Sequence, residues 1–271
     1  MVYDSLTEAP RNLKEGIDWL MALRGKDGEK NLAAMGAAVY KFLADKPVGF
    51  MEVPALDELK SISKKFMEKK ELRDLPFVRK LLGKFAWKVS KRVSSFHKKF
   101  GSIAESDWEN VIETRGVKPE DIAADLAKAV YGCARFLAHI KNPDKYESAY
   151  SSNATWDASC AKDPEACAVV LVGVAPMLYT GLRSLKDTSL DIVNRHRPSK
   201  CAEFRLGCLI KAVGYEEPGC RTSVSGSVIF KAFGAINRRI LTIFYDLAGF
   251  WAFYGFEKVG DMIVEVPRGT A

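Results

Sequence analysis

Apolar residues recur along most of this chain at spacings of three and four, the period that places side chains on one face of an α-helix. The longest such stretch follows Pro76 and continues for about six turns until Gly101 ends it. Its apolar positions are Val78, Leu81, Leu82, Phe85, Val89, Val93, Phe96 and Phe100. Only Met262–Val266 has the alternation typical of a strand. The pattern predicts an all-α protein, folded as an irregular multi-helix bundle.

Residues typical of helix starts divide this pattern into elements. Thr7 is expected to cap the first helix, with Glu8 and Pro10 in its first turns. Ser106 and Glu109 have the spacing of a capping box and predict the start of a short helix. Further helices are expected over 32–42, 54–66, 119–140, 164–182, 201–213 and 223–256, the last as one helix or two.

The polar stretch 144–163 is the one candidate boundary between domains. It separates an N-terminal helical bundle with basic helices, residues 1–143, from a cysteine-containing helical part, residues 144–271. The chain has no repeat of fixed period and no low-complexity linker. The two parts are therefore expected to pack as one domain.

Composition adds a local concentration of positive charge to this picture. The 271 residues are 48% hydrophobic, enough for a globular core, and carry a formal net charge of +7. Residues 60–99 hold 14 Lys and Arg against 3 Asp and Glu, whereas the rest of the chain sums to −4. Within that stretch the candidate contacts for an acidic partner are Lys84, Lys88, Lys91 and Arg92.

Three kinds of partner attract such a charged stretch: an anionic membrane leaflet, an acidic protein or nucleic acid. No nucleic-acid-binding motif accompanies it, so no nucleic-acid partner is expected. The alternative is a solvated face, because the apolar stripe after Pro76 already accounts for an amphipathic helix.

The distribution of charged and apolar residues predicts neither a signal peptide nor a membrane-spanning anchor. Charged residues interrupt 1–20, so a classical signal peptide is not expected. The longest uncharged run, 166–182, is about 17 residues long, at the lower limit for crossing a bilayer. It also contains Gly173, Pro176 and Gly181, so we predict a buried helix and no transmembrane helix.

Six cysteines, none within the first 130 positions, favour disulfides over buried free thiols or a metal site. They are Cys133, Cys160, Cys167, Cys201, Cys208 and Cys220. The spacing of seven within two of the pairs differs from the close pairs of a structural zinc site. On one helix, Cys201 and Cys208 would lie about 10 Å apart, too far to bond. Cys160 and Cys167 straddle an expected helix start, where a local bridge can form.

Signatures of catalysis are missing from the sequence. It contains no phosphate-binding glycine loop, no nucleophile elbow and no His-Glu-x-x-His pair. His97, His139 and His196 occur in unrelated contexts. We therefore expect no enzymatic activity and no cofactor.

Two segments resemble a known family. Residues 6–20, Leu-Thr-Glu-Ala-Pro-Arg-Asn-Leu-Lys-Glu-Gly-Ile-Asp-Trp-Leu, and residues 146–182, which include Asn-Ala-Thr-Trp-Asp-Ala-Ser-Cys at 153–160, resemble the variant erythrocyte surface antigens of Babesia parasites. Residues 247–251 resemble the same family more weakly. Full-length members are larger and carry a membrane-spanning helix near the C terminus, so this chain resembles a short or truncated member.

The resemblance implies display on the infected erythrocyte surface, antigenic variation that evades host immunity, and adhesion of the infected cell. The partners it implies are a membrane-anchored subunit of the same family, a host endothelial receptor and host antibody. The alternative is an intracellular or exported helical scaffold, in the parasite or host-cell cytoplasm. Such a scaffold would dock on an anionic membrane or an acidic cytoskeletal protein through Lys60–Lys99.

Overall fold

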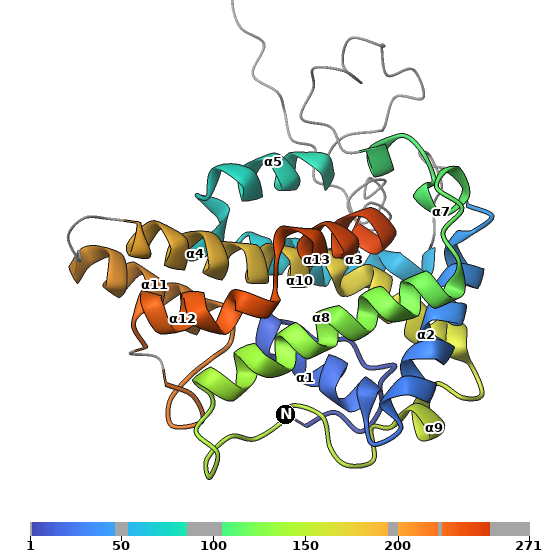
Figure 1. The fold of residues 1–271 in the computed structure, drawn as a ribbon, viewed down its shortest axis with the longest axis horizontal. Coiled ribbons are helices and arrows are strands. Elements are labelled where there is room, and N and C mark those ends of the chain that lie inside the picture. Colours follow the sequence, from blue (N-terminus) through green and yellow to red (C-terminus); the bar gives the residue numbers. More distant parts are fainter. Residues whose placement is uncertain (1, 47–53, 86–104, 195–199, 222–223, 250–271) are drawn as a thin grey trace, which may run out of the picture.

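The computed structural model describes residues 2–46, 54–85, 105–194, 200–221 and 224–249, and these residues fold into helices with no strand among them (Figure 1). Two isolated β-bridges, Tyr3 with Tyr150 and Lys141 with Cys220, join loop segments. The all-α prediction is confirmed. The elements are α1 (Leu13–Arg24), α2 (Gly28–Leu43), α3 (Pro54–Met67), α4 (Lys70–Arg73), α5 (Pro76–Phe85), η1 (Glu105–Asp107), α7 (Val111–Thr114), α8 (Pro119–Ile140), α9 (Trp156–Ser159), α10 (Pro164–Val193), α11 (Lys200–Ala212), α12 (Gly226–Ala232), η2 (Phe233–Ala235), α13 (Arg238–Ile243) and η3 (Phe244–Gly249).

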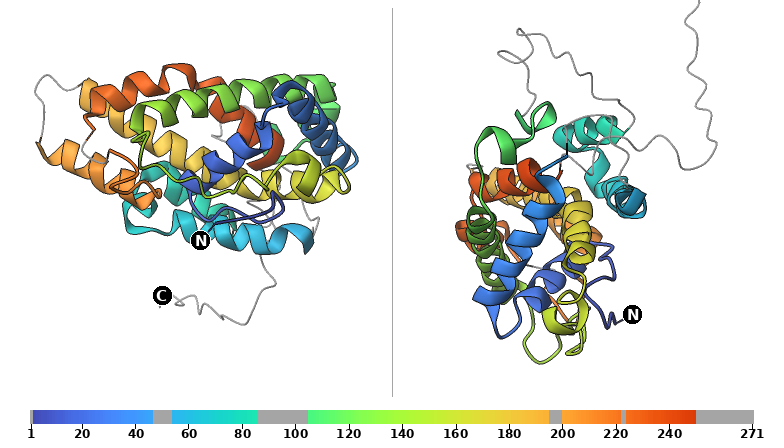
Figure 2. Two further views of the ribbon diagram at one scale, coloured as in Figure 1. Left: turned by 90° about the horizontal axis from the view of Figure 1, so that it is seen from below. Right: turned by 90° about the vertical axis from the view of Figure 1, so that its right-hand side faces the viewer.

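Helix α10 is the centre of the fold and contacts helices from both halves of the chain. Figure 2 shows it between α8 and α12 on one side and α3 on the other. Within the described residues it is the one helix long and apolar enough to span a membrane, and 83% of its most apolar window is buried inside the protein. The prediction of a buried helix is confirmed.

Glycines on α10 allow two neighbouring helices to approach closely. A Cβ added at Gly173 would lie 2.3 Å from the Cβ of Leu59 on α3. One added at Gly181 would lie 3.0 Å from a methyl carbon of Leu13 on α1. Both glycines therefore set the distance at which α3 and α1 pack on the central helix.

One hydrophobic core joins the described residues on either side of the stretch 144–163. Phe136 of α8 stacks on Phe233, with 4.7 Å between ring centroids, and meets Tyr215 edge-on at 5.6 Å. Trp19 of α1 is fully buried in the same core. Described residues from both parts of the sequence thus contribute to one hydrophobic core.

The first helix begins later than the sequence predicts. Asn12, not Thr7, caps α1, and its side chain accepts a hydrogen bond from the backbone N–H of Glu15. Residues before it form an irregular segment because Leu6 is fully buried and its carbonyl accepts a hydrogen bond of 2.8 Å from Trp19 Nε1. This tertiary contact outweighs the local preference for a longer helix.

The expected capping box at Ser106 and Glu109 is also wrong. Asn110 caps α7 by accepting from the N–H of Ile112, while its amide donates to carbonyls of residues 43, 44 and 46. Ser106 instead donates to Asp246 Oδ1 at 2.8 Å. The remainder of the long helix predicted after Pro76, residues 86–100, and the strand-like stretch 262–266 lie outside the described residues.

Candidate functional site

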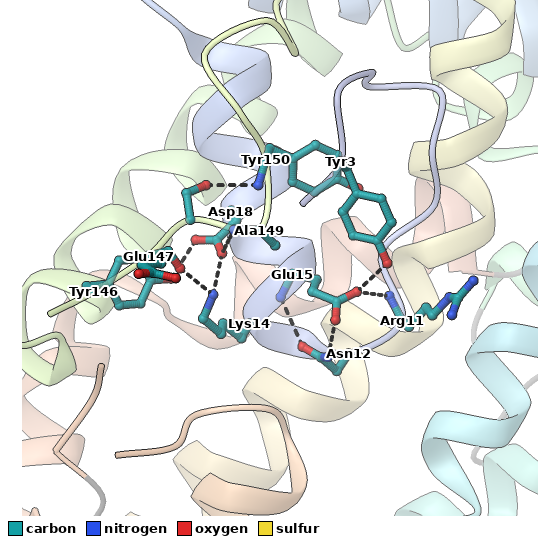
Figure 3. Close-up of polar contacts among 11 residues, drawn as sticks. Tyr3, Arg11, Asn12, Lys14, Glu15, Asp18, Tyr146, Glu147, Ala149 and Tyr150 are labelled. Carbon is teal, nitrogen blue, oxygen red and sulfur yellow. Dashed lines mark hydrogen bonds and ion pairs between the residues drawn. The ribbon is translucent and has the colours of Figure 1, made fainter. Parts of the chain in front are cut away.

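A seam of polar contacts fastens residues 146–151 to the N-terminal segment and α1 (Figure 3). At its centre Asp18 of α1 is 2% exposed. Its carboxylate accepts hydrogen bonds from Lys14 Nζ at 2.9 Å, from the Tyr146 hydroxyl at 2.5 Å and from the Ala149 N–H at 2.9 Å. A buried charge is tolerated in a protein when it is paired and hydrogen-bonded in this way.

Glu15, one turn earlier on α1, holds the other end of the seam. Its carboxylate accepts from the Tyr3 hydroxyl at 2.9 Å, the Arg11 N–H at 2.7 Å and the Asn12 amide at 2.6 Å. Burial, followed by the hydrogen bond to Glu15, raises the pKa of Tyr3 to about 12. The Tyr3 hydroxyl is therefore a neutral donor at physiological pH.

Two tyrosine rings and a short bridge complete the seam. The rings of Tyr3 and Tyr150 lie 4.9 Å apart, and the Tyr150 hydroxyl donates to the Glu8 carbonyl at 2.6 Å. The Tyr3 N–H donates to the Ala149 carbonyl at 2.8 Å, and the Ser151 N–H donates to the Tyr3 carbonyl at 2.9 Å. Burial is the main cause that raises the pKa values of Tyr146 and Tyr150, so both phenols stay protonated.

The arrangement fastens chain segments together. The donors around Asp18 and Glu15 are backbone N–H groups and side chains of the same seam. Burial is the main cause that raises the pKa values of Tyr3 and Tyr146, so both phenols stay neutral. The local sequence does not reveal this role, since Asp18 reads as one charge among several on an amphipathic helix. Its partners at 146 and 149 become neighbours only in the fold.

A disulfide closes the chain next to the seam. Cys160, at the end of α9, is bonded to Cys167 in the first turn of α10, with 5.8 Å between their Cα atoms and both residues fully buried. Ser159 beside it accepts a hydrogen bond of 3.0 Å from the Leu6 N–H. This is the pair for which the sequence allows a local bridge.

The other four cysteines are free. Cys133 and Cys220 are buried, and burial raises their pKa values to about 12 and about 11. Cys201 is exposed and Cys208 half-buried on α11, where their spacing keeps them from bonding to each other. Across the described part of the chain, His, Cys, Asp and Glu form no group of three or more that could hold a metal ion.

The structure gives Lys84 an internal partner. Its ammonium lies 2.7 Å from Asp107 Oδ2, also bonds the Tyr245 hydroxyl, and lies 4.8 Å from the centre of that ring. Burial lowers the pKa of Lys84, opposed by the charge of Asp107. The expectation that Lys84 contacts an acidic partner is corrected, because this side chain stabilises the fold. Lys88, Lys91 and Arg92 lie outside the described residues.

An open groove of about 770 Å³ lies beside the seam, between the N-terminal segment, α3 and the start of α10. Apolar side chains of Leu59, Ile62 and Val169 contribute to its lining, together with the carboxylates of Glu58 and Glu165. Tyr3, Glu8 and Arg11 also line it, so the groove and the seam share a wall.

Comparisons of this chain with protein-family models, with curated proteins and with solved structures found no match.

Proposed function

We propose that this chain is a non-enzymatic variant antigen of the Babesia erythrocyte-surface family, displayed on the infected erythrocyte. The observation that supports this proposal is the meeting of the two segments that carry the resemblance. Residues 6–20 and 146–182 are far apart in sequence, yet Asp18 bonds Tyr146 and Leu6 bonds Ser159. The resemblance therefore falls on one structural unit.

The Cys160–Cys167 bond supports a location outside a reducing cytosol. Structural disulfides are rare in cytosolic proteins because glutathione and thioredoxin keep thiols reduced. In this proposal the helical core is a scaffold whose surface changes to evade antibody, and the infected cell adheres to endothelium through it. A membrane-anchored subunit of the same family would hold the chain at the cell surface.

The test is the accessibility of the chain on intact infected erythrocytes. Cells are treated with trypsin, and the chain is detected by blotting with an antibody raised against residues 60–99. We expect the band to disappear while a cytoplasmic control protein survives. Survival of the band, with a control surface protein digested, would overturn surface display and favour the intracellular scaffold.

A vesicle assay then separates that scaffold from other intracellular roles. Binding to anionic vesicles that weakens with salt, and that is lost when Lys88, Lys91 and Arg92 are changed to Glu, would support docking through Lys60–Lys99. Lys84 is kept in this variant because its bond to Asp107 is structural. The variant must keep the helical circular dichroism of the parent protein.

A further inference from the structure

Helix α11 lies at the edge of the molecule with one face turned outward (Figure 1). Its inner face buries Ala202, Leu206, Leu209 and Ile210. The outer face carries Cys201, Phe204 and Cys208, which recur at spacings of three and four. Phe204 is 73% exposed, which leaves a large aromatic ring in water. An exposed ring between two free thiols is an uncommon surface for a charged, soluble helix.

The two thiols cannot react with each other. Seven residues of α-helix separate Cys201 from Cys208 by about 10 Å, whereas a disulfide needs Cα atoms within about 7 Å. Cys201 is exposed and Cys208 is half-buried. The Cys160–Cys167 bond indicates that the fold tolerates oxidising conditions, under which exposed free thiols pair with thiols of another molecule.

We infer that the outer face of α11 binds the same face of a second copy of this chain, with the two helices antiparallel. A twofold axis that passes between Phe204 and Arg205 places Cys201 of each copy opposite Cys208 of the other. The same axis keeps each side chain on one flank of the helix pair, so Phe204 of one copy meets Phe204 of the other, and this ring is exposed in the single chain. Aromatic rings that pack together leave water, so the surface is complementary to itself.

Helix geometry permits the bond. Packed helices have axes about 8–10 Å apart, and each Cα lies about 2.3 Å from its axis. Facing Cα atoms are then separated by roughly 3.4–5.4 Å, which overlaps the range that disulfides adopt. The 13 residues of α11 are about 20 Å long, so their outer face buries less area than a stable dimer requires. The pairing therefore depends on the disulfides.

The bond forms by exchange with a small-molecule disulfide such as oxidised glutathione. The thiolate of Cys201 attacks one sulfur of that disulfide, forms a mixed disulfide and releases one small-molecule thiolate. The thiolate of Cys208 on the second copy then attacks the Cys201 sulfur and releases the second. For each bond, two protein thiols are oxidised and one small-molecule disulfide is reduced to two thiols.

The test uses the full chain, incubated with oxidised glutathione and analysed by non-reducing electrophoresis and peptide mass spectrometry. We expect a reducible species of twice the 30.1 kDa monomer mass, with peptides of Cys201 linked to peptides of Cys208. The variants Cys201→Ser and Cys208→Ser should each remain monomeric, because the one thiol left on α11 then faces a serine and the other two free thiols, Cys133 and Cys220, are buried. A mixture of the two variants should recover the dimer through one bond.

This complementation separates the antiparallel register from other linkages. A parallel pair would bond Cys201 to Cys201, so each single variant would still dimerise, and that result would overturn the proposal. A monomer under all conditions, or dimers linked through Cys133 or Cys220, would overturn it as well. Helical circular dichroism and an intact Cys160–Cys167 bond in every variant exclude misfolding as the cause. The outcome is independent of where the chain is displayed.

Discussion

Replacement of Asp18 by Ala tests whether the seam holds the fold together. The change removes the acceptor for Tyr146 and Ala149, and the partner of Lys14. The Lys14 side chain is 21% exposed, so water still reaches it, and its ammonium retains the 2.8 Å hydrogen bond to the Glu147 carbonyl. The buried Ala149 N–H and the half-buried Tyr146 hydroxyl lose a partner that nothing else in the seam replaces.

The magnitude follows from these lost bonds. An unsatisfied buried donor costs about 1–3 kcal/mol, and two donors, the Ala149 N–H and the Tyr146 hydroxyl, lose their acceptor. We therefore expect Asp18→Ala to lower the free energy of unfolding by about 2–6 kcal/mol. Asp18→Asn retains one carbonyl acceptor but loses the charge, so a smaller loss of about 1–3 kcal/mol is expected.

The matched control is Asp187→Ala on α10. Asp187 also pairs with a cation four residues away, Arg183 at 3.2 Å, but it is 51% exposed, so its loss should cost about 0–1 kcal/mol. Urea denaturation followed by circular dichroism measures all three variants, and hydrogen exchange at the Ala149 amide reports the seam itself. If Asp18→Ala costs no more than Asp187→Ala, or leaves that amide protected, the seam does not stabilise the fold as argued.

Three further predictions follow from the disulfide, the central helix and the tyrosines. Loss of the bond in Cys160→Ala/Cys167→Ala should lower the free energy of unfolding by about 2.5 kcal/mol, as urea denaturation without reductant measures, and no change would contradict a structural role. Gly173→Ala should lower the free energy of unfolding by about 1–3 kcal/mol because the added Cβ would meet Leu59. Gly83→Ala, with open space around it, should leave that free energy unchanged or raise it slightly. Equal Tm values for the two variants would refute the close packing at Gly173. Burial raises the pKa of four tyrosines in the folded state, so their contribution to stability is complete below pH ~10 and is lost as pH rises through the folded pKa values. These tyrosines are Tyr3, Tyr146, Tyr150 and Tyr215. In an alkaline titration their phenolate absorbance should rise only as the helical circular dichroism signal disappears. Ionisation of these tyrosines while the helical signal is intact would refute this prediction.

Several helices could be predicted from the sequence because their ends depend on neighbouring residues. Helix α8 spans Pro119–Ile140, as predicted, since proline favours a first helical position and Asn142-Pro143 prevents continuation. Helix α3 likewise begins at Pro54. The buried character of α10 followed from its apolar composition. These features depend on proline geometry at the helix ends and on the three- and four-residue spacing of apolar side chains, both of which can be read from neighbouring residues.

The candidate site was not predictable in the same way. Two partners of Asp18, Tyr146 and Ala149, lie more than 120 residues away in sequence, and no local pattern marks them as neighbours. The helix start at Leu13 was mispredicted for the same reason, since the burial of Leu6 against Trp19 is a tertiary contact. Lys84 read as a surface charge until the fold placed Asp107 and Tyr245 beside it.

By itself, then, the sequence determined the helical class and most helix positions, and it allowed a local bridge between Cys160 and Cys167. The tertiary structure decided which charges are buried, which segments are fastened together and which face of α11 is turned to solvent. The physical reason is the distance along the chain over which each interaction acts. Capping, proline geometry and hydrophobic period act within a few residues, whereas the pairing of a buried charge depends on chain segments that only the packed core brings together.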